Sequence, residues 1–176
     1  INRIVTDSIS ALHLVSEPAG MENLRREGHV EATLRLVGNI MIDALHEQLP
    51  AARALKQYER LGVDAGSYVL WTMHRPANVD DPDVLATLVT ALAEIATRIP
   101  VVFPVHPRTR ARLEASGGWA MLDAAPGVRV TAPLGYLEFL SLSAHSRIIV
   151  TDSGGLQEES TALGIPCLTL RTNTER

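Results

Sequence analysis

The chain of 176 residues is poor in several features on which other proteins depend. A single cysteine, Cys167, excludes an intrachain disulfide framework and a zinc site built from several cysteines. Aromatic residues make up only 4%, which argues against a stacking platform for single-stranded nucleic acid. Sixteen Lys and Arg stand against 20 Asp and Glu, so no broad basic surface for nucleic acid is expected. No apolar run reaches the roughly 20 residues that cross a bilayer, and no membrane partner is predicted.

What the chain does have is the composition of an ordinary globular protein. Apolar residues make up 46% and charged residues 20%, which is enough apolar material for a sizeable core. The first residues, Ile1-Asn2-Arg3, show neither Met nor the blocks of a signal peptide, and the last ones directly follow an apparent strand. We therefore expect these residues to be a piece of a longer protein.

Short apolar runs alternate with longer amphipathic ones along the chain. The short runs predict strands at 12–15, 33–37, 68–71, 101–105, 128–130, 147–150 and 166–170. Helical patterns cover 83–98, 108–115, 137–144 and 156–163, and another helix is expected from an N-cap at Ser16 to a stop at Gly28. Continuous apolar strands that alternate with helices are typical of an α/β fold, a parallel sheet flanked by helices.

A proline marks the predicted division of the chain. A helical pattern over 41–49 is interrupted by Pro50, and a second helical stretch then runs to Gly62. We therefore expect residues 1–49 to close one α/β unit and residues 50–176 to form most of a second.

Polar residues follow the predicted strands at the edge where parallel sheets bind ligands, beyond the carboxyl ends of the strands. His74 follows one strand, His106 the next, and Ser153-Gly154-Gly155 a third. Loops are commonly polar, and a lone histidine is most often a structural hydrogen-bonding group. The gathering of three such loops nevertheless favours a ligand edge. No carboxylate or Cys partner accompanies the histidines, so no metal site is predicted.

The turn at Ser153 admits two interpretations. Its glycines let the backbone turn sharply, and the following helix start directs N–H groups and a positive dipole end outward, which suits a phosphate. Glu159 lies about one and a half turns into that helix, where a carboxylate can accept hydrogen bonds from the two hydroxyls of a ribose. In the alternative, the segment is a plain capped turn, and the glutamates only favour the helix N-terminus. No Gly-x-Gly-x-x-Gly, Walker or Gly-x-Ser-x-Gly motif is present, and no cofactor is predicted.

The order of motifs resembles one enzyme family over the whole chain. Residues 151–159, Thr-Asp-Ser-Gly-Gly-Leu-Gln-Glu-Glu, resemble the signature of the non-hydrolysing UDP-N-acetylglucosamine (UDP-GlcNAc) 2-epimerases. Further similar segments are His74-Arg75 with Asn78, Pro104-Val-His-Pro107, the loop 133–139, and the stretches 163–166 and 170–176. One position departs from the family pattern, because Ala77 stands where many relatives have Glu.

The resemblance implies a two-domain glycosyltransferase-B-like fold with the UDP-sugar between two Rossmann-like domains. Residues 1–49 would be the end of the N-terminal domain and the crossover, and residues 50–176 most of the C-terminal, UDP-binding domain. The family interconverts UDP-GlcNAc and UDP-N-acetylmannosamine (UDP-ManNAc) by eliminating UDP and adding it back. Its catalytic carboxylates lie in the N-terminal half, upstream of Asn2-Arg3, and are not among these residues. A homodimer in the cytoplasm, without a metal or cofactor, is implied as well.

The resemblance also implies roles for particular residues. Phe139 would stack on uracil, and Leu134 would offer backbone hydrogen bonds to the base. Glu159 would hold the ribose hydroxyls. His74 would assist the departure of UDP and is the predicted catalytic residue. The diphosphate would be held by Ser153, Gly154, Gly155 and Arg176.

Two further positions are implied only as regulatory. Arg75 and His106 match residues that bind a second, allosteric UDP-GlcNAc in bacterial relatives, and Ala77 puts this regulation in doubt. Three other functions stay open at this point: a non-catalytic UDP-sugar-binding module, a hydrolysing epimerase, and a glycosyltransferase on the same fold.

Overall fold

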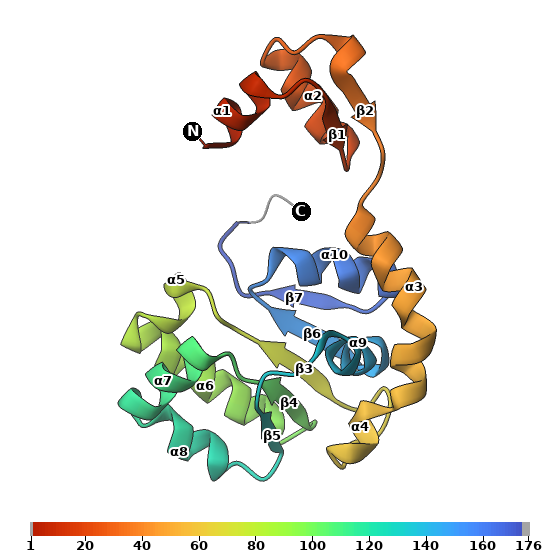
Figure 1. The fold of residues 1–176 in the computed structure, drawn as a ribbon. Coiled ribbons are helices and arrows are strands. Elements are labelled where there is room, and N and C mark those ends of the chain that lie inside the picture. Colours follow the sequence, from red (N-terminus) through yellow and green to blue (C-terminus); the bar gives the residue numbers. More distant parts are fainter. Residues whose placement is uncertain (1, 174–176) are drawn as a thin grey trace. The chain divides into compact units, whose positions relative to one another are not determined.

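A computed structural model describes residues 2–173 of the chain (Figure 1). The chain divides into two compact units, and the division falls between Ala44 and Leu45. The predicted assignment of residues 1–49 and 50–176 to two domains of a larger enzyme stays a prediction. None of the helices in the described part of the chain has the length and apolar character to span a membrane.

The first unit is a small two-stranded parallel sheet with helices. It contains α1 (Asn2–Ile9), β1 (His13–Val15), α2 (Pro18–Arg26), a 3-10 turn (Glu31–Thr33) and β2 (Leu34–Leu36). His13 pairs with Leu34 in the parallel register. Val15, Met21, Leu24 and Leu34 form its buried core.

The second unit is built on a five-stranded parallel sheet. Its strands are β3 (Val69–Thr72), β4 (Val101–Pro104), β5 (Val128–Thr131), β6 (Ile148–Thr151) and β7 (Cys167–Thr169). Their order across the sheet is β5-β4-β3-β6-β7. The helices are α3 (Ile40–Leu55), which starts before the division at Ala44, α4 (Gln57–Arg60), α5 (Pro76–Val79), α6 (Pro82–Ala96), α7 (Pro107–Ser116), α8 (Gly118–Asp123), α9 (Tyr136–His145) and α10 (Gly154–Leu163).

Successive residues from Tyr68 to Trp71, in and just before β3, are buried on alternate faces of this sheet. Val69 and Trp71 join a core that is completed by apolar residues of α6, α7 and α8. Tyr68 and Leu70 face the other way, into a core shared with α9 and α10. The predicted α/β fold with both faces of a parallel sheet covered is therefore confirmed, and every predicted strand is present.

The prediction that Pro50 interrupts a helix is wrong. Instead of ending there, α3 runs from Ile40 to Leu55 with the proline inside it. A proline removes one N–H from the helix ladder. Here the completely buried Leu45 and Ala52 anchor the helix on both sides of it. The break comes instead at Lys56, whose φ of 45° is left-handed.

Other differences concern helix starts and short helices. The cap of α2 is Glu17 and not Ser16, and this helix is nevertheless close to the predicted one. The sequence pattern did not predict α1, α5 or α8. Of these, α5 has only four residues and α8 six, too few for a hydrophobic period to show.

The sheet reverses its order of construction between two neighbouring strands. From β3 the chain builds outward through β4 to β5, and it then returns to add β6 on the other side of β3. Helices after β3 and β6 therefore leave toward opposite faces, and such a switch point is where open parallel sheets bind ligands. The register pairs Thr72 with Thr151, so both strands end at the same level.

A steric constraint at the start of β5 gives a prediction on stability. A Cβ on Gly127 would lie 2.0 Å from the carbonyl oxygen of Ala96, which is backbone and has no side-chain freedom to retreat. We expect Gly127→Ala to lower the free energy of unfolding by about 1–3 kcal/mol, the usual cost of overpacking. Urea denaturation measures this change. Gly135→Ala is the control, because a Cβ there meets only Glu138 Oε2 at 3.6 Å; equal stability of the two variants would contradict the prediction.

Candidate functional site

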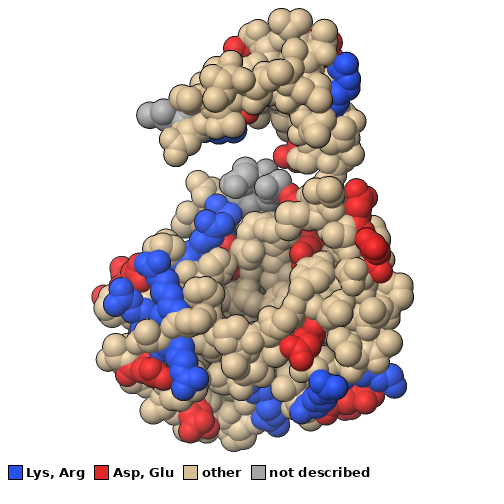
Figure 2. All heavy atoms as spheres, in the orientation of Figure 1, with Lys and Arg blue, Asp and Glu red and all other residues tan. Residues whose placement is uncertain are grey.

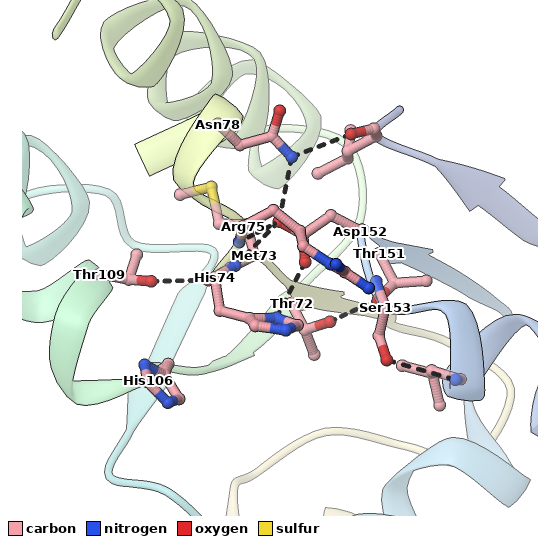
Figure 3. Close-up of polar contacts among 12 residues, drawn as sticks. Thr72, Met73, His74, Arg75, Asn78, His106, Thr109, Thr151, Asp152 and Ser153 are labelled. Carbon is pink, nitrogen blue, oxygen red and sulfur yellow. Dashed lines mark hydrogen bonds and ion pairs between the residues drawn. The ribbon is translucent and has the colours of Figure 1, made fainter. Parts of the chain in front are cut away.

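A buried carboxylate lies at the switch point. Asp152 follows β6 directly and is completely buried. Its Oδ2 accepts three hydrogen bonds from the loop after β3: from the backbone N–H of His74 at 2.9 Å, the backbone N–H of Arg75 at 2.8 Å, and Asn78 Nδ2 at 3.0 Å (Figure 3). One side chain therefore joins the two loops between which a ligand is expected to bind.

The second oxygen of the same carboxylate faces the predicted catalytic residue. Asp152 Oδ1 lies 2.9 Å from Nδ1 of His74. The His74 side chain is 39% exposed, so one side of the ring contacts the buried carboxylate while the rest reaches solvent. The ring of His106 lies beside it, with 5.8 Å between the ring centroids. The structure thus brings together the two histidines that follow β3 and β4.

The loop that carries His74 is held at further points. Asn78 Nδ2 also donates to the carbonyl oxygen of Leu170 at 2.9 Å, which ties the loop to the end of β7. Completely buried Thr109 donates to the carbonyl oxygen of Met73 at 2.7 Å. Thr72 and Thr151 join their hydroxyls at 2.7 Å across β3 and β6. His74 therefore projects from a loop that is held by α7, by β6 and by the end of β7.

The start of α10 forms the second part of the site. Ser153 caps this helix as predicted, with its Oγ accepting from the N–H of Leu156, and Gly154 and Gly155 form the first turn. The first N–H groups of a helix have no intrahelical acceptor, and the helix dipole is positive there. The guanidinium of Arg171 lies next to this turn, because a Cβ on Gly154 would be 3.8 Å from its Nη1. The arrangement suits a phosphate group.

Glu159 is the buried acid of this helix. Only 9% of the residue is exposed, and burial raises the pKa of its carboxyl group. The pKa of Tyr136 is raised by its own burial and then by the charge of Glu159, which places the two groups near each other. A buried carboxylate of this kind is costly unless it is hydrogen-bonded, and a diol can supply such donors.

The predicted uracil-binding residues lie near the same helix. Leu134 and Phe139 are partly buried and pack against a cluster that includes Leu156 of the first turn of α10. Arg75 and His106, the predicted regulatory residues, are both exposed, and His106 Nδ1 accepts a hydrogen bond from the N–H of Arg108 as the cap of α7. Arg176 lies outside the described residues. The ligand-binding roles of all these residues stay predictions.

Positive charge gathers on the side of the molecule formed by α5 and α7 (Figure 2). Part of it is compensated, because Arg108 and Arg112 both pair with Asp80. The hydrogen bond from Arg108 is the main reason why the pKa of Asp80 is lowered. Within residues 2–173, no three His, Cys, Asp or Glu side chains form a group that could hold a metal ion.

Sequence reasoning missed three residues of the site. Asp152, Asn78 and Arg171 were part of the recognised motifs, but no role was predicted for them. A signal for Asp152 was available, because it is an acid placed between a wholly apolar strand and a glycine turn. Its partners were not predictable, since they lie more than 70 residues away in the chain.

The comparisons with known proteins agree with this geometry. The family model described as UDP-N-acetylglucosamine 2-epimerase matches residues 1–176. A curated UDP-N-acetylglucosamine 2-epimerase of Methanocaldococcus jannaschii is 38% identical over 181 residues, covering 100% of this chain and 50% of the relative. A UDP-2,3-diacetamido-2,3-dideoxy-D-glucuronate 2-epimerase of Pseudomonas aeruginosa is also 38% identical, over 99% of this chain and 48% of the relative.

A solved structure shows the same fold. The M. jannaschii UDP-GlcNAc 2-epimerase in complex with UDP-GlcNAc and UDP is 37% identical, with a TM-score of 0.87 over 99% of this chain and 49% of that one. This likeness confirms the predicted fold class. The chain spans about half the length of the curated relatives it matches.

The burial of Glu159 predicts how stability depends on pH. A raised pKa in the folded state means that folding favours the protonated acid, so this contribution to stability is lost as pH rises above the ordinary carboxyl range. Glu159→Gln should therefore raise the free energy of unfolding at neutral pH and change it little in acid. Urea denaturation across this pH range measures the difference. Glu158→Gln is the control, because it removes the same charge from a less buried neighbour. A Glu159→Gln variant that is less stable than the wild type at neutral pH would refute the prediction.

Proposed function

Because the chain belongs to the UDP-N-acetylglucosamine 2-epimerase family, we propose that it forms the UDP-binding part of an enzyme that interconverts UDP-GlcNAc and UDP-ManNAc. The observation that carries this proposal is the pairing of two features at the switch point. Asp152 joins the loop that carries His74 to the segment that leads into the glycine turn at the start of α10. A phosphate held by the turn would lie next to an imidazole that can assist its departure as a leaving group.

The rest of the nucleotide fits the same neighbourhood. A diphosphate at Gly154 and Gly155 would meet the helix N-terminus and the Arg171 guanidinium. The ribose would extend along α10 so that its hydroxyls donate to Glu159, and the uracil would reach Phe139. The solved relative that binds UDP-GlcNAc and UDP has this fold over the same residues, which supports this assignment.

The proposed epimerisation requires two groups of residues in the protein. A base must remove the proton at C2, and UDP must be held firmly enough to add back to the same intermediate. The described residues supply groups for the second task. We expect the base to come from catalytic carboxylates outside residues 1–176, as the family resemblance implies.

A second candidate substrate follows from the comparisons. The P. aeruginosa relative named for UDP-2,3-diacetamido-2,3-dideoxy-D-glucuronate is as similar to this chain as the M. jannaschii epimerase, at 38% identity. The two sugars share UDP and a 2-acetamido group and differ at C3 and C6. The UDP-binding residues described above would serve both substrates, so the choice rests on groups that contact the sugar.

The remaining implications of the resemblance have no such support. Regulation through Arg75 and His106, a homodimeric assembly and a cytoplasmic location stay predictions. The structure shows of Arg75 and His106 that both are exposed.

The proposed reaction has a direct test. The full-length protein is incubated in D2O with UDP-GlcNAc and, separately, with the diacetamidoglucuronate, and proton NMR follows C2. We expect deuterium at C2 together with the 2-epimer of one substrate, and no turnover by residues 1–176 alone, because the base for C2 is proposed to lie outside them. Both substrates left unchanged by the full-length protein would rule out the proposal.

The role of Glu159 has a test of its own in ligand affinity. Charge-assisted hydrogen bonds to two hydroxyls contribute roughly 1.5–3 kcal/mol each, and Gln replaces one acceptor by a donor. Glu159→Gln should weaken UDP binding by about ten- to a hundredfold, at 1.4 kcal/mol per factor of ten. Calorimetric titration of UDP into the full-length proteins measures it, with Glu158→Gln as the matched control. Equal dissociation constants for wild type and Glu159→Gln would remove Glu159 from the site.

A further inference from the structure

We propose that Asp152 is the positioning residue of His74: it keeps a proton on Nδ1 and thereby makes Nε2 the atom that exchanges a proton with the departing UDP. This inference rests on the proposed function for the reaction itself. Which nitrogen of His74 carries the proton does not depend on that function, because the surrounding hydrogen bonds determine it.

The orientation of the Asp152 carboxylate is determined by the loop after β3. Two backbone N–H groups and Asn78 Nδ2 donate to Oδ2 at 2.8 to 3.0 Å. These donors keep the carboxylate from rotating and leave Oδ1 directed at His74 Nδ1, 2.9 Å away (Figure 3). Among the described residues, the buried Oδ1 accepts no well-aligned hydrogen bond, and the polar contact available to it is that with His74 Nδ1 at 2.9 Å.

An ionised carboxylate can only accept hydrogen bonds, so the imidazole must present an N–H to it. The cost of leaving a completely buried charge unmatched makes this demand strong. His74 therefore carries its proton on Nδ1 in the neutral form, and Nε2 is left with its lone pair. The 39% exposure of the side chain is consistent with Nε2 being open to a ligand.

The two directions of the reaction require this arrangement. In the elimination, the base outside these residues takes the proton from C2, and the electron pair of that C–H bond forms the C1=C2 double bond. The C1–O bond breaks, its electron pair leaves on UDP, and the imidazolium gives the proton of Nε2 to that phosphate. In the re-addition, the C1=C2 double bond is lost as C2 receives a proton on its opposite face and the C1–O bond forms again, and neutral Nε2 takes its proton back from the phosphate. A neutral imidazole with its proton on Nε2 cannot accept there, so only the Nδ1–H form serves both steps.

The three donors also make Asn the diagnostic substitution. In Asp152→Asn, the carboxamide oxygen is required by the N–H groups of His74, Arg75 and Asn78, so its NH2 group faces the imidazole. An NH2 group donates to Nδ1, which forces the proton of neutral His74 onto Nε2. The volume of the side chain is unchanged, while the tautomer is reversed.

The first measurement is independent of activity. Nitrogen-15 NMR of histidine-labelled full-length protein, with His74 assigned by His74→Asn, reports which nitrogen carries the proton. We expect Nδ1–H in the wild type and Nε2–H in Asp152→Asn. A wild-type His74 with its proton on Nε2 would overturn the proposal, whether or not the protein is an epimerase.

The second measurement is kinetic. Asp152→Asn should lower kcat by about a hundredfold or more, the usual contribution of general acid–base catalysis, and leave the affinity for UDP within about twofold. Because Asp152 acts through His74, adding Asp152→Asn to His74→Asn should lower kcat little further. A single variant with wild-type kcat, or two effects that simply multiply, would contradict the proposed role.

A matched control separates positioning from loss of structure. Asn78→Ala removes one donor from Oδ2 but leaves Oδ1 facing His74, so it should lower stability without changing the tautomer. If Asp152→Asn does not fold, the wild-type tautomer and the Asn78→Ala variant still decide the matter. If the wild-type protein folds, shows Nδ1–H and has no epimerase activity, the proposed function fails while the placement of the proton is upheld.

Discussion

The site of this protein depends on a single buried acid, Asp152. A carboxylate that is removed from water must be matched by donors, and the fold supplies them from a loop more than 70 residues earlier in the chain. Because the match uses backbone N–H groups, it determines the path of the loop itself. The side chains of that loop, His74 above all, are placed as a consequence. Asn78 also donates to the carbonyl oxygen of Leu170 at the end of β7. Hydrogen bonds around Asp152 therefore link the ends of β3, β6 and β7.

A second buried acid, Glu159, differs from Asp152 in how its charge is compensated. The carboxylate of Asp152 is matched inside the protein, whereas that of Glu159 is buried with a raised pKa for which burial is the cause. The protein carries this cost at the residue that we propose to hold the ribose. Groups that are strained or poorly solvated in the free protein are typical of binding sites, because the ligand supplies what is missing.

Much of the architecture was predictable from local sequence patterns. All strands were predicted because buried parallel strands are continuous apolar runs bounded by turn residues, and that signal is local. Ser153 was predictable as a cap because its partner, the N–H of Leu156, is three residues away. Pro50 misled the prediction, since the helix through it is held by the burial of Leu45 and Ala52, and packing of that kind leaves no local signature. The family resemblance added roles that no spacing rule supplies.

The sequence by itself determined the alternation of strands and helices, the loops that carry polar residues, and the family. Only the tertiary structure decided which of those loops meet. The strand order β5-β4-β3-β6-β7 places β3 beside β6, and the register sets Thr72 opposite Thr151, so His74 and Asp152 come into contact. The physical reason is that a local pattern specifies which residues are buried, whereas the pairing of distant strands depends on the packing of the whole sheet. The function of Asp152 lies in that pairing, and for this reason it became visible only in the folded chain.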